Sequence, residues 1–217
     1  MSGDAALAAW KIEGIEQVLG YKINKDDPVD YTVTTRNEGH LVKGQRIHLC
    51  TVPLPLGAVR LRNGEPTSSP ELLFLEKANE WHILQLIFLG YQLCSHPVGR
   101  PKEALTTKEK LTNFVEQTPG YRGRKKALYA LKFVIDGSAS VMETYNCMKT
   151  ILPHFLGGYC LKKPVLNSRI AVKKEDRKLL GQNNCYPDML FIDEKQVVEY
   201  QSFEHHNTPA EQSADAE

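Results

Sequence analysis

The sequence predicts a mixed α/β protein, with helices and small β elements first and a helix followed by three strands later. Two patterns predict this class. Apolar residues recur at helical spacing over 4–20 and 72–93, which is typical of amphipathic or buried helices. Near the C-terminal end, two short apolar stretches within 186–201 flank the polar pair Asp193-Glu194, which is typical of a β-hairpin. The 217 residues, 41% of them hydrophobic, suffice for one large or two small domains with a core.

The first part of the chain is expected to pack helices around small β elements. Ser69-Pro70-Glu71 begins a buried helical pair well, because Ser is a favoured N-cap and Pro is favoured at the first helical position. In chain order we expect a helix over 4–20, strands over 31–35, 46–52 and 59–61, helical pieces from 70 to about 78 and from about 80 to 90, and helices over 108–117 and 127–135.

The second part is expected to open with one helix and to continue with strands. Asp136-Gly137 breaks the chain, and Pro153 ends the helix that begins after Ser140. In chain order we then expect a strand region over 164–172, a polar turn with a short helical stretch over 173–182, and the two strands of the hairpin from Asp188 onward.

Positive charge gathers in the middle of the chain, although the whole chain has a formal net charge of only +1. Between positions 100 and 132 there are nine basic residues against three acidic ones. Arg122, Arg124, Lys125 and Lys126 stand at the start of an expected helix, where positive charge opposes the helix macrodipole. Either the phosphate groups of a nucleic acid supply a compensating attraction, or these residues form a solvated basic turn.

The cysteines and the N-terminus predict a cytoplasmic protein that does not enter a membrane. The cysteines form no CxxC pair and have no recognisable zinc-ligand spacing, which is typical of reduced thiols. Residues 1–10 lack the pattern of a signal peptide, and no run of about 18 apolar residues is present. The five cysteines are Cys50, Cys94, Cys147, Cys160 and Cys185.

The hairpin brings acidic residues together. If its turn is centred on Asp193-Glu194, paired residue numbers sum to 387 and Asp188 lies opposite Glu199. A turn two residues longer places Gln201 opposite Asp188, on the same face as Glu199. Opposed Cβ atoms lie about 4.5–5.5 Å apart, so two carboxylates repel unless a magnesium-type cation lies between them. The alternative is structural: Pro-Asp is a common entry to a strand, and one Glu is a common edge residue.

The pattern Pro187-Asp188, ten residues, then Glu199-Tyr200-Gln201 resembles the PD-(D/E)XK nuclease superfamily, whose fold is restriction-endonuclease-like. The resemblance implies that Asp188 and Glu199 bind Mg²⁺ or Mn²⁺. Gln201 stands where the motif has Lys, so the resemblance implies that Gln201 orients the attacking water. The implied fold is a partial αβββα core.

The resemblance adds two further candidate sites. Members of the superfamily commonly place a metal-reaching Glu on the helix before the first core strand, and Glu143 occupies that place. The Ser140 and Glu143 spacing is also a capping box, which explains it structurally. After the motif, His205 or His206 stands where relatives place a His that contacts the scissile phosphate or moves a proton; the alternative is an exposed pair.

The resemblance implies two domains. Residues 1–133 form a scaffold or DNA-docking region, loosely similar to abortive-infection antitoxin-type regulators in its Ser69-Pro70-Glu71 helix, or else an ordinary buried helical hairpin. Residues 134–217 form a nuclease domain expected to be truncated, since Thr208-Pro209 only begins its second helix.

The implied function is metal-dependent hydrolysis of phosphodiester bonds in nucleic acid, with DNA as the expected substrate and phage defence as the expected setting. A homodimer or a partner protein is the expected assembly. The alternative is a non-catalytic, antitoxin-like regulatory protein that binds DNA and keeps the nuclease fold; Gln201 and the early end of the chain favour it.

Overall fold

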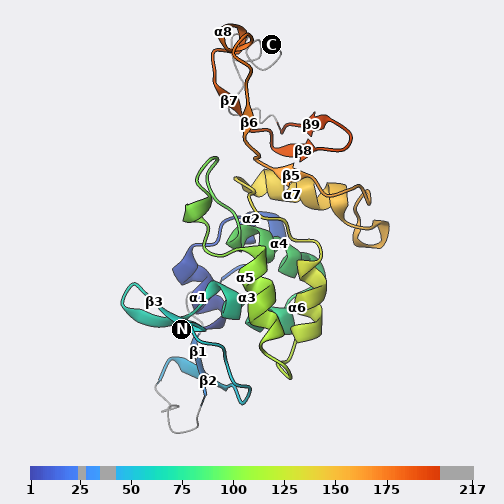
Figure 1. Ribbon diagram of the computed structural model, residues 1–217. Helices are drawn as coiled ribbons and strands as arrows, with labels where there is room; N and C mark the ends of the chain where they lie inside the picture. Colours follow the sequence, from blue (N-terminus) through green and yellow to red (C-terminus); the bar gives the residue numbers. More distant parts are fainter. Residues whose placement is uncertain (24–27, 35–42, 201–217) are drawn as a thin grey trace. The chain divides into compact units, whose positions relative to one another are not determined.

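The computed structural model describes residues 1–23, 28–34 and 43–200, and in these ranges the protein is mixed α/β (Figure 1). Eight α-helices in the described ranges accompany small sheets of two or three strands, so the predicted mixed class is confirmed. The chain forms two compact units: unit 1 contains Met1–Ser95 and Ala104–Asp136, and unit 2 contains His96–Glu103 and Gly137–Glu217. The predicted domain boundary at 133–134 lies just before the division at 136–137.

Four helices form the core of unit 1, and each of them contacts at least two of the others (Figure 1). The most deeply buried is the second, in which every residue from Leu86 to Leu93 is buried. The first begins as the sequence predicts, because Ser69 Oγ accepts a hydrogen bond from Leu72 N–H at 3.2 Å and Pro70 occupies the first helical position. The four helices are α3 (Pro70–Glu80), α4 (Ile83–Leu93), α5 (Lys108–Glu116) and α6 (Arg124–Leu131).

The single helix predicted over 4–20 is wrong: the chain forms α1 (Gly3–Trp10) and α2 (Ile15–Leu19) instead. The break has a local cause, since Lys11 and Gly14 both have positive φ, 54° and 73°, which ends one helix and begins the next. The apolar spacing was nevertheless informative, because Leu7, Trp10 and Ile15 are buried.

Two small sheets complete unit 1. The predicted strands near residues 31 and 46 are present, and they pair in parallel. The strand predicted at 59–61 continues into a hairpin whose turn residues Asn63 and Gly64 have φ of 53° and 82°, as a two-residue hairpin turn requires. The strands are β1 (Val29–Val33), β2 (Gln45–Leu49), β3 (Val59–Arg62) and β4 (Glu65–Ser68).

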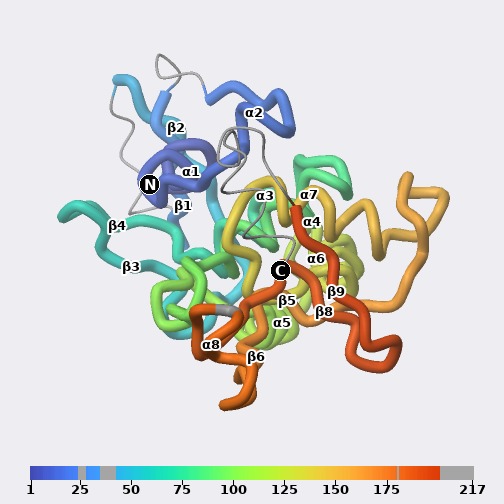
Figure 2. Tube along the Cα trace, turned by 90° about the horizontal axis from the view of Figure 1, so that it is seen from above, coloured from blue at the N-terminus to red at the C-terminus, as the bar shows by residue number. Residues whose placement is uncertain are grey.

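Unit 2 contains one long helix and a three-stranded antiparallel sheet with the order β5-β8-β9, whose strands lie side by side (Figure 2). A second, two-stranded sheet, β6-β7, and a short helix lie between β5 and β8 in the sequence. The elements are α7 (Val141–Ile151), β5 (Val165–Leu166), β6 (Ile170–Ala171), α8 (Arg177–Leu180), β7 (Asn184–Cys185), β8 (Met189–Phe191) and β9 (Gln196–Val198). Single 3-10 turns occur at Pro101–Glu103 and His154–Leu156.

The continuous strand predicted over 164–172 is wrong. Asn167 adopts a left-handed conformation with φ of 46° and divides the segment into β5 and β6. Asn tolerates this region better than most residues, because its short polar side chain can form local hydrogen bonds. The two halves therefore pair with different partners, β5 with β8 and β6 with β7.

No helix in the described ranges is long and apolar enough to cross a membrane. The five cysteines form no disulfide, and Cys50, Cys94 and Cys147 are buried.

Candidate functional site

The hairpin formed by β8 and β9 follows the first of the two predicted registers. Met189 pairs with Val198 and Phe191 pairs with Gln196, so paired numbers sum to 387. The chain reverses over residues 192–195, where Lys195 has φ of 54°. One step beyond the last pair, at the open end of the hairpin, stand Asp188 and Glu199.

Each of the two acids accepts a hydrogen bond from the backbone of the opposite strand end, Glu199 from Asp188 and Asp188 from Tyr200. Glu199 Oε2 accepts a long hydrogen bond from Asp188 N–H at 3.4 Å. Asp188 Oδ2 accepts a short one from Tyr200 N–H at 2.6 Å. Glu199 is exposed and Asp188 is half-buried, so both carboxylates are held at a solvent-accessible edge of the sheet.

Burial raises the pKa of the Asp188 carboxyl above its ordinary value. The hydrogen bond from Tyr200 N–H lowers this pKa in part, whereas the negative charge of Glu143 raises it further. The ionised form of Asp188 is therefore disfavoured where it stands, and a cation beside it would relieve both the burial and the repulsion.

Glu143 lies in the first turn of α7 and is 8% exposed. Ser140 Oγ accepts a hydrogen bond from Glu143 N–H at 3.1 Å, which is one half of the predicted capping box. The Glu143 carboxylate does not return to Ser140 N–H; its Oε2 accepts from Ala139 N–H at 2.9 Å. The same oxygen accepts from Asn167 Nδ2 at 2.7 Å, which the capping explanation does not require.

Asn167 is a residue that the sequence analysis missed. Its backbone N–H donates to the Asp188 carbonyl oxygen at 3.4 Å, and its side chain donates to Glu143, so it touches both acid-bearing residues. The available signal was the polar run Asn167-Ser168-Arg169 between two apolar stretches, which favours a break in the strand.

The side chains at the open end of the hairpin can be compared with the ligands that a divalent cation needs. No three His, Cys, Asp or Glu side chains of the described ranges gather into a group that could hold a metal ion. Asp188 and Glu199 nevertheless offer adjacent carboxylates, and Mg²⁺ commonly takes one or two carboxylates and completes its shell with water. Carboxylate oxygens are hard ligands, which suit Mg²⁺ or Mn²⁺ better than zinc. Asp188 and Glu199 are therefore the residues that would hold the ion.

The remaining predicted residues of this site are Gln201, His205 and His206, together with the helix predicted from Thr208. All of them lie outside the described residues.

The basic cluster, defined as Arg122, Arg124, Lys125 and Lys126, belongs to unit 1, whereas the acids belong to unit 2. Two of its members bind the C-terminal ends of helices. Arg124 Nε donates to Val115 O at 3.0 Å in the last turn of α5, and Lys126 Nζ donates to Trp81 O at 2.9 Å just after α3. Cations stabilise such ends because the carbonyl groups there carry partial negative charge.

These contacts offset the repulsion of positive charge at the start of α6. Arg124 and Lys126 thus have a structural role, while Arg122 and Lys125 are exposed. Nucleic-acid contact by the cluster stays a prediction.

The Lys126→Met substitution is expected to destabilise unit 1 by about 1 kcal/mol, because a charged hydrogen bond to the end of α3 is lost. Lys125→Met, its exposed neighbour, is the matched control and is expected to change stability by less than about 0.5 kcal/mol. Chemical denaturation followed by tryptophan fluorescence measures both, since the two tryptophans, Trp10 and Trp81, lie in unit 1. Equal stability of the two variants would contradict the capping role.

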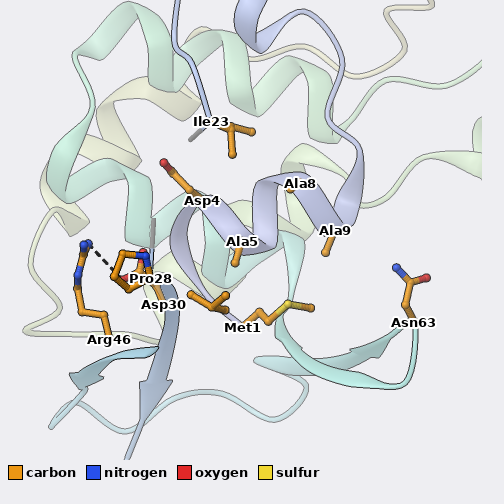
Figure 3. Close-up of a pocket in the computed structure, with 11 residues that line it drawn as sticks. Met1, Asp4, Ala5, Ala8, Ala9, Ile23, Pro28, Asp30, Arg46 and Asn63 are labelled. Carbon is orange, nitrogen blue, oxygen red and sulfur yellow. Dashed lines mark ion pairs between the residues drawn. The ribbon is translucent and has the colours of Figure 1, made fainter. Parts of the chain in front are cut away.

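The cavities at the N-terminal helix lie within unit 1, and neither is lined by the acids of the hairpin. One, of about 400 Å³, has the alanine face of α1 as a wall and the ion pair of Arg46 and Asp30, at 3.5 Å, at its rim (Figure 3). The other, of about 690 Å³, is lined by the buried Lys77 and its partner Asp4, whose Nζ and Oδ1 atoms lie 2.5 Å apart.

Outside these cavities, Asp188 and Glu199 stand at the open end of a hairpin, with Glu143 and Asn167 behind Asp188. Comparison of the chain with protein-family models, with curated proteins and with solved structures found no match.

Proposed function

We propose that the chain is a metal-dependent hydrolase of phosphodiester bonds in nucleic acid, with Asp188 and Glu199 as the ligands of Mg²⁺ or Mn²⁺. The observation that carries the proposal is the opposition of these two acids at the open end of the β8-β9 hairpin. Glu199 accepts a hydrogen bond from Asp188 N–H, and Asp188 accepts one from Tyr200 N–H. These hydrogen bonds hold the two carboxylates at the end of the hairpin, and a cation beside them would offset the burial and the Glu143 charge that raise the pKa of Asp188.

The order of elements in unit 2 supports the proposal. Helix α7 precedes three antiparallel strands with the spatial order β5-β8-β9, as expected for the αβββ part of a restriction-endonuclease-like core. Asp188 stands immediately before the middle strand and Glu199 immediately after the edge strand. The insertion of β6, α8 and β7 between β5 and β8 is an addition to that plan.

Each residue then has a chemical role in the proposal. A bound divalent cation supplies Lewis acidity and lowers the pKa of a coordinated water. Asp188 and Glu199 hold and orient the ion, and Glu143 adds negative charge behind Asp188. Gln201 orients the attacking water, and His205 or His206 contacts the phosphate or moves a proton.

Substrate, assembly and setting follow from the resemblance and belong to the proposal. DNA is the proposed substrate, with Arg122 and Lys125 of the basic cluster as candidate contacts to its phosphates. A role in phage defence and a homodimer or partner protein are proposed on the same basis, and a cytoplasmic location is proposed from the cysteines and the N-terminal sequence.

A second candidate function is metal-independent binding of DNA by a regulatory, antitoxin-like protein. Two observations favour it: Gln201 replaces the Lys of the motif, and no group of three potential ligands converges among the described residues. In that case the acids would be remnants of a nuclease site.

Cleavage of plasmid and single-stranded DNA in the presence of Mg²⁺, Mn²⁺ or a chelator separates the two functions. The nuclease proposal expects nicked or shortened DNA with either metal and none with the chelator; an RNA of the same sequence tests the choice of polymer. Retention of intact DNA that is the same with metal and with chelator would support the second function and overturn the first.

A further inference from the structure

Asn167 is a buried residue, and only one end of its side-chain amide group forms hydrogen bonds. It is 8% exposed, and its left-handed conformation turns the chain out of β5. Its side-chain Nδ2 donates two hydrogen bonds, to Glu143 Oε2 at 2.7 Å and to Gly137 O at 3.0 Å. Both donor positions of the amide group are therefore in use.

The oxygen atom of the same amide group, Oδ1, has no hydrogen-bond partner among the described residues. Asn167 Oδ1 is buried and accepts no hydrogen bond from any described residue. Rotating the amide by half a turn does not remove the problem, because Oδ1 would then face the Glu143 carboxylate and the Gly137 carbonyl, which are both acceptors. The unpaired atom is therefore the oxygen.

A buried oxygen without a donor costs about 1–3 kcal/mol unless a group from outside the protein chain satisfies it. This oxygen is bonded to the same carbon as Nδ2, so it lies in the same buried surroundings as the Glu143 carboxylate. Two acceptor groups and no free donor create a negative potential, which attracts a cation.

The backbone places this oxygen beside the strand that carries the other acid. Asn167 N–H donates to the Asp188 carbonyl, next to the β5-β8 pair of Leu166 and Met189. Glu143 also acts electrostatically on the Asp188 carboxyl. Helix α7, the end of β5 and the start of β8 thus meet at Asn167.

We propose that Asn167 is a further ligand of the cation held by Asp188 and Glu199, with Oδ1 serving as an uncharged oxygen ligand and the Glu143 carboxylate holding the amide group in place through Nδ2. The inference rests on the proposed function only for the presence of a cation; it assigns that cation a new ligand and a positioning residue. It also explains why the Glu143 carboxylate accepts a hydrogen bond from Asn167 at the end of β5, since capping of α7 does not require that bond.

Binding of Mn²⁺ alone, measured by calorimetry and by the paramagnetic signal of the free ion, tests the inference without a nucleic acid. Asn167→Ala is expected to weaken Mn²⁺ binding about 10–100-fold relative to the wild-type chain, as loss of a supporting ligand does at other metal sites. Asn146→Ala, on the same helix as Glu143, is the matched control and is expected to bind Mn²⁺ as the wild-type chain does.

Asn167→Asp keeps the size of the side chain and covers the case in which the alanine variant does not fold. It replaces a donor to Glu143 with a third negative charge, so the metal-free protein is expected to melt at a lower temperature and Mn²⁺ to raise that temperature more than in the wild-type chain. A merely structural Asn167 would lower the melting temperature in both variants and leave Mn²⁺ affinity within about twofold of wild type, because only loss of a ligand moves affinity by a factor of ten or more.

The outcomes separate the inference from the nuclease proposal. Wild-type Mn²⁺ binding with unchanged affinity in both Asn167 variants overturns the inference and leaves the nuclease proposal standing. Weaker binding in Asn167→Ala without DNA cleavage by the wild-type chain supports the inference and overturns the nuclease proposal. Absence of Mn²⁺ binding by the wild-type chain overturns both.

Discussion

Asp188→Asn is expected to lower metal-dependent DNA cleavage by about 10³-fold while the fold of unit 2 is kept. Loss of a ligand charge removes several kcal/mol of stabilisation from a metal-assisted transition state, and each 1.4 kcal/mol corresponds to about tenfold in rate. The fold is expected to persist because the amide oxygen of the new side chain can still accept the hydrogen bond from Tyr200 N–H. Initial rates of plasmid nicking at saturating Mg²⁺ measure the effect.

The same substitution is expected to leave the metal-free protein as stable as the wild-type chain, or slightly more stable, at neutral pH. Burial raises the pKa of Asp188, so the native state holds this proton more tightly than the unfolded state does. The resulting contribution to stability is complete below the ordinary Asp pKa, near about pH 4, and is lost as the pH rises through the higher native value. Denaturation in chelator from pH 3 to pH 7 should show this loss in the wild-type chain and not in the variant.

Asp193→Asn is the matched control, because it removes the same charge from the turn of the same hairpin. Asp193 is 76% exposed and forms a 3.3 Å ion pair with Lys162, which is of the exposed kind that contributes little. Its cleavage rate is expected to stay within about twofold of wild type, since a charge on the exposed turn takes no part in holding the ion. Equal loss in both variants, or full activity in Asp188→Asn, would contradict the assignment of Asp188.

Gly123→Ala is expected to destabilise unit 1 by about 3 kcal/mol. Gly123 has φ of 89°, which an L-residue with a side chain adopts only with strain. A Cβ atom there would also lie 2.7 Å from the backbone nitrogen of Asn79 and 2.8 Å from the carbonyl carbon of Ala78. Because these are backbone atoms at the end of α3, neither can move without displacing the helix. Chemical denaturation followed by tryptophan fluorescence measures the loss in unit 1.

Gly120→Ala separates the two causes, since Gly120 has nearly the same φ, 85°, and a Cβ atom added there would meet no described atom within 4 Å. The strain of a positive φ alone is expected to cost about 1 kcal/mol there. A Gly123 variant no less stable than the Gly120 variant would show that α6 does not approach α3 as closely as described.

Helix starts were more accessible from the sequence than helix ends. Ser69 and Ser140 precede helices as expected, and Thr107 precedes another; each accepts a capping hydrogen bond, because an N-cap acts on backbone groups two or three residues away. The hairpin was accessible for the same reason: the period of two along a strand limited the register to two possibilities, and the structure follows the one whose paired numbers sum to 387.

Features that depend on distant residues were not accessible. The basic cluster suggested a ligand, yet Lys126 reaches the end of a helix 45 positions earlier in the chain. The segment 164–172 was expected to be one strand, yet Asn167 turns it towards two partners and binds Glu143, 24 positions earlier. Spacing within a segment carries no information about such contacts.

Capping, turn length and strand period act over a few residues, so the mixed α/β class, several helix starts and the two possible partners of Asp188, Glu199 and Gln201, were predictable from the sequence. The contact of Asn167 with Glu143, and the binding of helix ends by two members of the basic cluster, became visible only in the folded chain. These contacts form when segments far apart in the chain pack together. A buried polar group is then hydrogen-bonded to neighbours that the folded chain supplies, and local sequence spacing does not identify them.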